Sequence, residues 1–210
     1  MDDLSLLYGI MAGDGCLSRG LKNRTISITC NYYNDRPFFD EVVIPLLNKI
    51  RGKKTKYRLR PKYGKIEINF SDKELFNKLV SIGFPVGKKW SKLEIPDIFQ
   101  SNKYTKNIIA GFFATDGSVV RANNHGILYP RLEIHNKCHK ILEQMQSFLL
   151  TNNIKANIYK IKPRNGFSIS RLDMNGKINL LKFESLIGFI NPKHKSLFEG
   201  FRDGRVAQPG

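Results

Sequence analysis

Two nine-residue stretches, residues 7–15 (LYGIMAGDG) and 109–117 (IAGFFATDG), constrain this chain more than any other feature. Both have glycine at the third position, and both close on Asp-Gly, with Asp14 and Asp116 as the acids. They lie about half of the 210-residue chain apart. A motif that recurs at half-length predicts a duplicated unit, with one copy in each half of the chain.

Each stretch has the pattern of a buried helix. Residues 4–11 and 108–114 are apolar on nearly every side of the helix they would form. A helix without a polar face is a buried helix. Small residues recur one turn apart on each helix: Gly9 with Gly13, and Gly111 with Thr115. They would let two backbones approach below the usual ~8–10 Å. We therefore expect the two helices to pack face to face.

The ends of these helices carry the chemistry. Gly15 and Gly117 are expected to end them in the left-handed conformation, which leaves Asp14 and Asp116 side by side. A carboxylate in the last turn opposes the helix dipole. One such helix alone would most simply be a buried helix with a glycine cap. Two paired carboxylates in unfavourable positions indicate a bound cation.

The charge of the chain points to a polyanionic partner. Thirty-five Lys and Arg stand against eighteen Asp and Glu, a net charge of +17, which favours nucleic acid over an anionic membrane. No apolar run approaches the ~20 residues that span a bilayer. The three cysteines lack the spacing of a zinc site or a disulfide scaffold, and the acidic start is unlike a signal peptide. We expect an intracellular, reducing location, the cytoplasm or an organelle matrix.

The segments between the motifs repeat as well. A polar loop is expected over residues 18–24. Period-two alternation predicts strands at 25–29, 57–62, 65–70, 118–123, 131–135, 158–162 and 167–172. Helices are predicted at 35–50, from Ser71 or Asp72 to Gly83, at 139–150 and at 178–186, with Pro45 kinking or breaking the first of them. We expect both halves to follow the order αββαββα.

The two nonapeptides resemble those of the LAGLIDADG homing endonucleases, over nearly the whole chain because the pattern between them repeats. The resemblance implies an α+β fold of two pseudo-twofold related αββαββα domains. They would pack through the motif helices, with antiparallel sheets forming a DNA-binding saddle. The expected boundaries are residues 1–98 for the N-terminal domain, 99–105 for a linker, 106–201 for the C-terminal domain and 202–210 for a polar tail.

The polar faces of the strands are where DNA would lie. They mix the residue types that contact base edges in the major groove, although a solvated sheet face has a similar composition. The predicted DNA-binding residues are Thr25, Ser27, Thr29, Arg58, Arg60, Lys62, Lys65, Glu67, Asn69, Arg121, Arg131, Glu133, His135, Lys160, Lys162, Ser168 and Ser170.

Phosphodiester hydrolysis needs an activated water and neutralisation of the departing oxygen, which divalent metals held by carboxylates supply. The resemblance implies that Asp14 and Asp116 hold the metals, assisted by backbone carbonyls near Gly13 and Thr115. It also implies a basic residue near each centre. The predicted residues are Lys89, with Lys88 as the near alternative, and Lys193, with His194 opposite Lys89 in the alignment. This departure suggests two unequal centres. A polar residue is expected after the second strand of each half, at Cys30 or Asn31 and at Asn136-Lys137.

The resemblance implies a monomeric, metal-dependent DNA endonuclease that hydrolyses both strands of a long asymmetric site across the minor groove and leaves short 3′ overhangs. Hard oxygen ligands favour Mg²⁺. Two or three ions are expected, with Mn²⁺ as a substitute and Ca²⁺ binding without cleavage. The chain is expected to be intron-encoded or free-standing. The alternatives are a maturase that binds intron RNA without cutting DNA, and a DNA-binding regulator that has lost cleavage, against which both retained acids argue.

Overall fold

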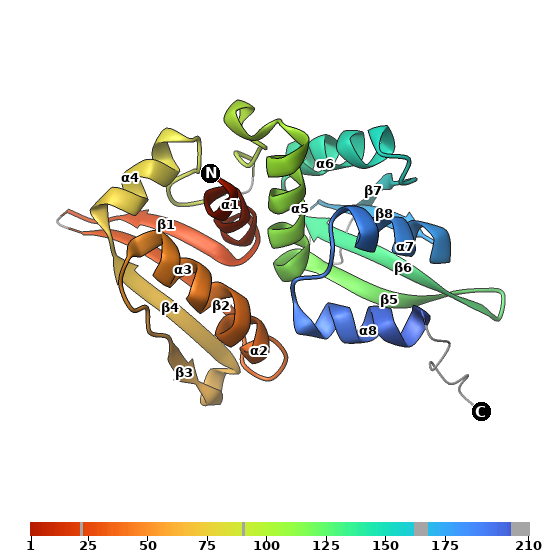
Figure 1. Cartoon of the computed structure of the whole chain (residues 1–210), viewed down its shortest axis with the longest axis horizontal. Helices are drawn as coiled ribbons and strands as arrows, with labels where there is room; N and C mark the ends of the chain where they lie inside the picture. Colours follow the sequence, from red (N-terminus) through yellow and green to blue (C-terminus); the bar gives the residue numbers. More distant parts are fainter. Residues whose placement is uncertain (22, 90, 162–167, 203–210) are drawn as a thin grey trace.

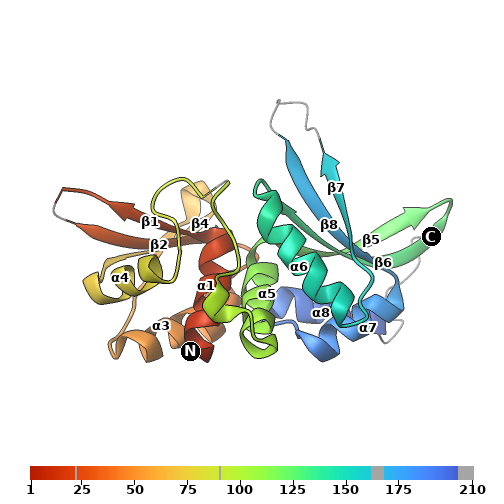
Figure 2. The same ribbon diagram turned by 90° about the horizontal axis from the view of Figure 1, so that it is seen from above.

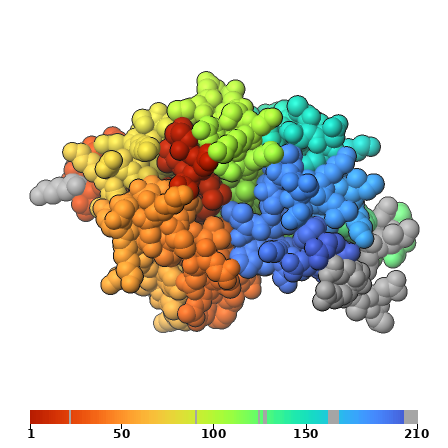
Figure 3. Space-filling view, viewed as in Figure 1, coloured from red at the N-terminus to blue at the C-terminus, as the bar shows by residue number. Residues whose placement is uncertain are grey.

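Two halves of the same topology lie side by side in the computed structural model, which describes residues 1–21, 23–89, 91–161 and 168–202. Figure 1 shows the first half in red to yellow and the second in green to blue, with the two motif helices between them. The surface divides in the same way in Figure 3.

The N-terminal half has the predicted αββαββα order. Its elements are α1 (Asp2–Asp14), β1 (Gly15–Arg19), β2 (Arg24–Asn31), α2 (Arg36–Phe38), a π-helical turn (Phe39–Val43), α3 (Ile44–Arg51), β3 (Arg58–Arg60), a 3-10 turn (Pro61–Tyr63), β4 (Lys65–Ser71) and α4 (Lys73–Ser81). A further 3-10 turn, Asp97–Phe99, lies in the segment that connects the two halves.

The C-terminal half repeats this order and adds one helix. Its elements are α5 (Asn102–Asp116), β5 (Gly117–Asn124), β6 (Ile127–Asn136), α6 (His139–Thr151), β7 (Asn157–Ile161), β8 (Ile169–Asn175), α7 (Lys177–Leu186) and α8 (Pro192–Arg202). The predicted α+β duplication is confirmed. Helix α5 begins inside the stretch expected to be linker, and α8 covers a segment for which no helix was predicted.

The two sheets are built to one plan. Each has four antiparallel strands, in the orders β1-β2-β4-β3 and β5-β6-β8-β7. Gly15 pairs with Ile28, and Gly117 pairs with Ile134, so the first strand enters both sheets at the same register. In Figure 2, α1 and α5 run side by side at the centre, and the β1–β2 and β5–β6 hairpins extend away from them in opposite directions.

Glycines permit the close contact of α1 with α5. A Cβ on Gly9 would overlap the carbonyl of Ile108, and one on Gly111 would lie 2.6 Å from the carbonyl oxygen of Leu6. Both obstacles are backbone atoms of the facing helix, which no rotamer change can remove. The prediction that small residues line this contact is confirmed.

The conformation expected for Gly15 and Gly117 is wrong. Both are extended, with φ of −92° and −90°, because each passes directly from the helix into the first strand. Glycine is needed there for space instead: a Cβ on Gly15 would lie 2.5 Å from the Cα of Met11, and one on Gly117 would overlap the Phe113 carbonyl.

Two further local predictions are corrected. The expected loop at 18–24 is a hairpin tip, because β1 continues to Arg19, which pairs with Arg24. The helical run after β2 passes Pro45 without a break. A π-helical turn precedes this proline, with the Ile44 N–H donating to the Phe39 carbonyl, so Pro45 falls in the first turn of α3, where a missing N–H is tolerated.

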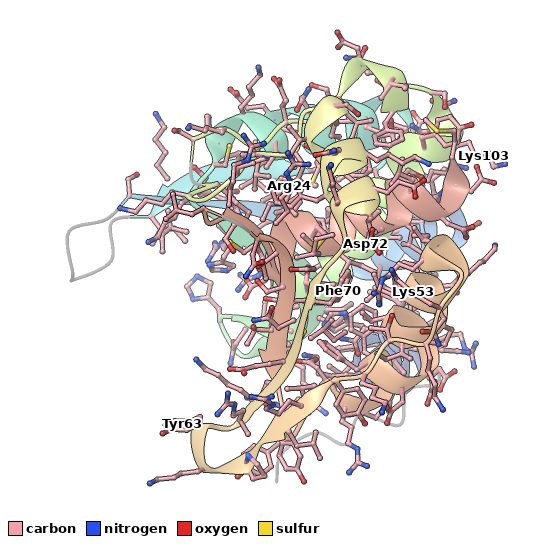
Figure 4. The ribbon with its side chains drawn as sticks, turned by 90° about the vertical axis from the view of Figure 1, so that its left-hand side faces the viewer. Arg24, Lys53, Tyr63, Phe70, Asp72 and Lys103 are labelled. Carbon is pink, nitrogen blue, oxygen red and sulfur yellow. The ribbon has the colours of Figure 1, made fainter. Side chains whose placement is uncertain are left out.

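The start of α4 shows a predicted cap in place. Asp72 Oδ1 accepts a hydrogen bond from the Leu75 N–H at 3.1 Å. Its other oxygen lies 3.1 Å from Arg51 Nε and 3.2 Å from Lys53 Nζ. The Arg51 guanidinium also stacks 3.8 Å from the centre of the Phe70 ring. These contacts tie α3 to the end of β4 (Figure 4).

Candidate active site

The two motif carboxylates lie together at the ends of α1 and α5. A Cβ on Gly13 would lie 3.5 Å from the Asp116 carboxyl carbon and would overlap the Thr115 hydroxyl. Gly13 therefore leaves the room that the end of α5 occupies. Asp14 and Asp116 are both largely buried, and no ion pair to either of them is found among the described residues.

Each carboxylate accepts one hydrogen bond from the second strand of its own half. The Cys30 thiol donates to Asp14 Oδ2 at 3.0 Å, and the Asn136 amide donates to Asp116 Oδ2 at 2.8 Å. These donors are equivalent, because Cys30 and Asn136 each stand two residues beyond the partner of the motif glycine. The polar residue expected after each second strand is therefore Cys30 in one half and Asn136 in the other.

The environment opposes ionisation of both acids. Burial raises the pKa of Asp14 above its usual range, while the Cys30 hydrogen bond and Lys89 act in the opposite direction. Burial, reinforced by the charge of Asp14, raises the pKa of Asp116 to about 6. Two buried carboxylates that disfavour each other's charge are a donor set that suits a divalent cation.

Lys89 reaches this centre from the connecting segment. Val86 forms a parallel bridge to Leu17 of β1, and the Gly87 N–H donates to the Leu17 carbonyl at 2.7 Å. Gly87 has φ of +80°, a left-handed conformation suited to glycine. This turn aims the lysine at the end of α1.

The Lys89 ammonium caps α1. It donates to the carbonyls of Met11, Ala12 and Gly13 at 3.0, 2.9 and 2.6 Å. A cation at this end offsets the negative pole of the helix dipole. Burial lowers the pKa of Lys89, and the nearby charges of Asp116 and Asp14 raise it.

The expected counterpart of Lys89, Lys193, does not occupy the matching place. It points to the N-terminal half, where its Nζ lies 3.0 Å from Asp35 Oδ1. Asn191 caps α5 instead, donating to the Ala114 carbonyl at 2.9 Å. The sequence separation is 77 residues both from Ala12 to Lys89 and from Ala114 to Asn191. Aligning the two halves on their motifs without a gap would have identified Asn191 as the counterpart of Lys89. The prediction instead aligned the lysines near the two sites and missed it.

His194 does not stand opposite Lys89 in space. His194 is 1% exposed and its ring lies 5.1 Å from the Phe113 ring centre, and neither ring nitrogen has a hydrogen-bond partner within the part of the chain that the structure describes. Burial, followed by the charge of Lys193, lowers the pKa of His194 to about 4. It packs as a neutral ring beneath the end of α5.

Of the two backbone carbonyls expected to assist a metal, that of Gly13 is already engaged, and that of Thr115 stays a prediction. The Gly13 carbonyl already accepts the shortest of the three Lys89 hydrogen bonds. The Thr115 hydroxyl turns back into its own helix and donates to the Phe112 carbonyl at 2.9 Å. Asp14 and Asp116 remain the residues that fit a cation best, each with one oxygen, Oδ1, outside the hydrogen bonds described above.

The outer face of the N-terminal sheet has the predicted composition. The register pairs Ser27 with Asn69, Thr29 with Glu67, and Arg58 with Glu67, so these residues share one face. The others on it are Thr25, Arg60 and Lys65. Arg60 Nε lies 3.1 Å from Glu67. Lys62 is in the 3-10 turn beyond β3, not on a strand, and Leu59 of β3 is 36% exposed.

The outer face of the C-terminal sheet differs from the prediction at β8. Arg131, Glu133 and His135 share one face as expected. Ser170 is wrong: it alternates with the core residues Leu172 and Met174, is buried, and contacts His139 Nδ1 at 2.9 Å. Lys160 pairs with Ser170 and so shares that inner side, although it is exposed at the edge strand.

Three other predicted DNA contacts need comment. Arg121 lies on the opposite side of its strand from Val120, which pairs with Arg131, so it is not on the face of Arg131. Ser168 is exposed just before β8. Lys162 lies outside the described residues.

The missed members of the C-terminal face are Arg171 and Asp173. The Arg171 Nε lies 2.8 Å from Asp173 Oδ1, beside the Arg131–Glu133 pair at 2.9 Å. The register places Asp173 opposite Glu133 and Arg171 opposite His135. Two arginines and two acids therefore alternate across the middle of this face. The prediction had assigned the alternation of β8 the other way round and had placed Ser168 and Ser170 there.

The fold and the paired motif agree with a known family. A family profile described as a LAGLIDADG-like domain matches residues 103–188, which contain the second motif and the β-strands after it. The C-terminal half of the chain is thus similar to a LAGLIDADG-like domain. The N-terminal half, outside the matched range, has the same sheet topology, register and helix contact, so the two halves are built as copies of one unit.

Solved structures of homing endonucleases share the fold. I-DmoI in complex with DNA and calcium is 18% identical, with a TM-score of 0.62 over 93% of this chain and 95% of that one. I-SmaMI bound to an uncleaved DNA target with calcium is 11% identical, with a TM-score of 0.60 over 98% and 94%. At these identities the likeness concerns the fold alone.

One curated relative matches this chain in sequence. The tRNA-splicing ligase RtcB of Methanopyrus kandleri is 22% identical over 207 residues, which is 89% of this chain and 20% of that protein. The chain thus spans about a fifth of the length of this relative. Among the described residues, no helix is both long and apolar enough to cross a membrane.

Proposed function

We propose that this protein is a site-specific endonuclease that cuts both strands of double-stranded DNA with divalent metal ions. The observation that carries the proposal is the pair of buried carboxylates, Asp14 and Asp116, at the contact of two helices between two basic sheets. I-DmoI and I-SmaMI, which share the fold, form complexes with DNA, and this supports DNA as the partner here.

The residues of the centre have separate tasks in this reaction. Asp14 and Asp116 would hold the metal, and Cys30 and Asn136 keep one oxygen of each carboxylate fixed. A bound divalent ion would supply an activated water and neutralise charge on the scissile phosphate. Lys89 places a positive charge beside both acids, where it would stabilise charge that develops on the phosphate.

The sheets would supply binding and sequence discrimination. Their outer faces present Arg, Lys, Asn and Thr side chains at fixed registers, and arginines held by carboxylates are pre-oriented for base edges. A single chain with two unlike faces suits a long asymmetric site, whereas two identical faces would require a near-palindrome. We propose that the protein acts as a monomer with Mg²⁺, Mn²⁺ substituting and Ca²⁺ supporting binding alone.

The test separates binding from cutting. Asp14→Asn keeps the shape of the side chain and removes the charge, and a neutral amide is a poor ligand for Mg²⁺. We expect it to retain binding to target DNA in a gel shift with Ca²⁺ and to lose double-strand cleavage of a supercoiled plasmid with Mg²⁺. Full cleavage by this variant would refute the assignment, and so would loss of binding by a folded variant.

A maturase on the same scaffold would behave differently. It would bind intron RNA and promote splicing in Mg²⁺, with no cleavage of DNA that spans the insertion site. Both acids are retained at the helix contact, and this favours cleavage. Comparing the parent protein on that DNA, with Mg²⁺ or with EDTA, decides between the two functions.

A further inference from the structure

The two halves are least alike at the caps of the motif helices. Lys89 gives α1 an ammonium that donates to three carbonyls. At the equivalent place, Asn191 gives α5 a neutral amide that donates to one. Asn191 itself is 1% exposed. The end of α5 therefore lacks the positive charge that the end of α1 has.

The second amide contact of Asn191 is to the other half of the protein. Its Nδ2 lies 3.3 Å from Asp35 Oδ1, the oxygen that also accepts from Lys193 Nζ at 3.0 Å. The Asn191 side-chain oxygen accepts from the Lys193 backbone N–H at 3.0 Å, which fixes the first turn of α8. One carboxylate of the N-terminal half thus holds two side chains of the C-terminal half.

Asp35 is itself held in position by the end of β2. The Asn31 side-chain oxygen accepts from the Tyr33 and Asn34 N–H groups at 2.9 and 3.2 Å, and the Asp35 N–H donates to the Asn31 carbonyl at 3.1 Å. This turn follows directly on Cys30, the thiol partner of Asp14. The Asp35 side chain is 15% exposed and that of Lys193 is 37% exposed, so the ion pair is shielded on the Asp35 side and open to solvent on the lysine side.

The charges of this cluster act on one motif acid. Asp35 and Lys193 are both among the groups that perturb Asp14, with opposite signs. The groups that perturb Asp116 are Asp14, Asn136 and Lys89. The lysine of the C-terminal half therefore serves the acid of the N-terminal half, while Lys89 lies near both acids.

We propose that Asp35 is a positioning residue of the cleavage centre: it holds Lys193 of the C-terminal half on the Asp14 side, so that the two strands are cut by unequal sets of groups. Asn191 is the second part of this device, because it joins Asp35 to the last turn of α5. The inference rests on the proposed nuclease function and adds to it a residue that acts through Lys193 without touching DNA or metal.

The test is strand-resolved cleavage under single-turnover conditions, on duplex target labelled on either strand, with Mg²⁺. Asp35→Asn retains an oxygen for Asn191 and removes the charge that holds Lys193. We expect one strand to be cut roughly 10-fold more slowly, as is usual when a residue that orients a reacting group is lost. The other strand should keep its rate, nicked plasmid should accumulate, and DNA affinity in Ca²⁺ should be unchanged.

A double-variant comparison shows whether Asp35 acts through the lysine. Lys193→Met should slow the same strand, and Asp35→Asn combined with Lys193→Met should be no slower than Lys193→Met alone. The matched control is Asp40→Asn, which removes a half-exposed carboxylate one turn further along the same helical run, paired to Arg36 at 3.6 Å. It should leave both strand rates unchanged, and thermal unfolding should show that all variants are folded.

The possible outcomes separate the two claims. Parental rates in Asp35→Asn, equal slowing of both strands, or additive losses in the double variant would overturn the positioning role while leaving the nuclease function intact. A parent protein that binds its target but cuts neither strand would refute the proposed function and the inference with it.

Discussion

Asp116→Asn should make the metal-free protein more stable, although it removes a motif residue. The carboxyl is buried at the negative end of α5 and beside Asp14, and these surroundings raise its pKa from 3.8 to about 6. The native state therefore binds this proton more tightly than the unfolded chain does. Its ionisation costs stability, and the amide cannot ionise. An asparagine oxygen would still accept the hydrogen bond from Asn136.

The size and the pH range of the effect follow from that shift. One pKa unit corresponds to 1.36 kcal/mol, so a shift of about 2 units corresponds to ~3 kcal/mol. For a raised carboxyl pKa, the cost is absent below the unfolded value near pH 4, grows between pH 4 and 6, and is constant above pH 6. We expect Asp116→Asn to gain ~3 kcal/mol at pH 7, a rise in Tm of roughly 6–12 °C for a chain of this size, and little at pH 4.

The assay is thermal or urea unfolding in EDTA at pH 4 and pH 7, compared with the parent protein. Asp97→Asn, at an exposed carboxylate of the connecting segment, is the control and should change stability by less than ~0.5 kcal/mol. Mg²⁺ should then stabilise the parent more than Asp116→Asn, because a cation that binds only the native state raises its stability. A variant that is equally stable or less stable at pH 7 would refute the reasoning about the paired carboxylates.

Three more predictions concern the helix contact, the cap and the sheet. Gly9→Ala would drive a methyl group into the Ile108 carbonyl and should cost ~3 kcal/mol in urea unfolding, whereas Gly20→Ala, whose Cβ would be 3.8 Å from its nearest neighbour, should be near neutral. Lys89→Met removes three hydrogen bonds at the end of α1 and should lower cleavage by ~10² or more without weakening DNA binding in Ca²⁺; unchanged rates would exclude a catalytic role. DNA affinity that depends on ~8 phosphate contacts should fall by roughly 10⁴ between 50 and 200 mM salt. Arg60→Gln should make the slope of log affinity against log salt shallower by ~1 if Arg60 contacts a phosphate. A slope shallower than about −3 for the parent protein would exclude the sheets as the DNA surface.

Much of the fold was predictable because its determinants are local. Period-two and helical patterns do not depend on the rest of the chain, so the helix over residues 139–150 was predicted within one residue. The cap at Asp72 follows from the ability of a short carboxylate to bond the next free N–H groups. The glycines of the helix contact were identifiable because small residues one turn apart serve no purpose on an isolated helix.

The alternation in β8 shows where local pattern is insufficient. Ile169 and Leu172 are three residues apart, so they cannot lie on the same face of a regular strand, and the segment itself does not show which of them belongs in the core. The structure buries Leu172 and Met174 against the helices and turns Ile169 to the other face. Burying Leu172 and Met174 gains more free energy than burying Ile169 alone. With Leu172 and Met174 turned inward, Arg171 and Asp173 lie on the outer face.

The sequence by itself determined the duplicated unit, the pairing of the motif helices and the strongly basic charge, because spacing, residue size and composition are properties of the chain alone. Only the tertiary structure decided which groups meet at the helix ends. Asp35 and Asn191 are far apart in sequence, and their contact exists only because the two halves pack against each other. Lys193 was predicted as the counterpart of Lys89, but packing of the two halves decided its partner and places its Nζ 3.0 Å from Asp35 of the other half.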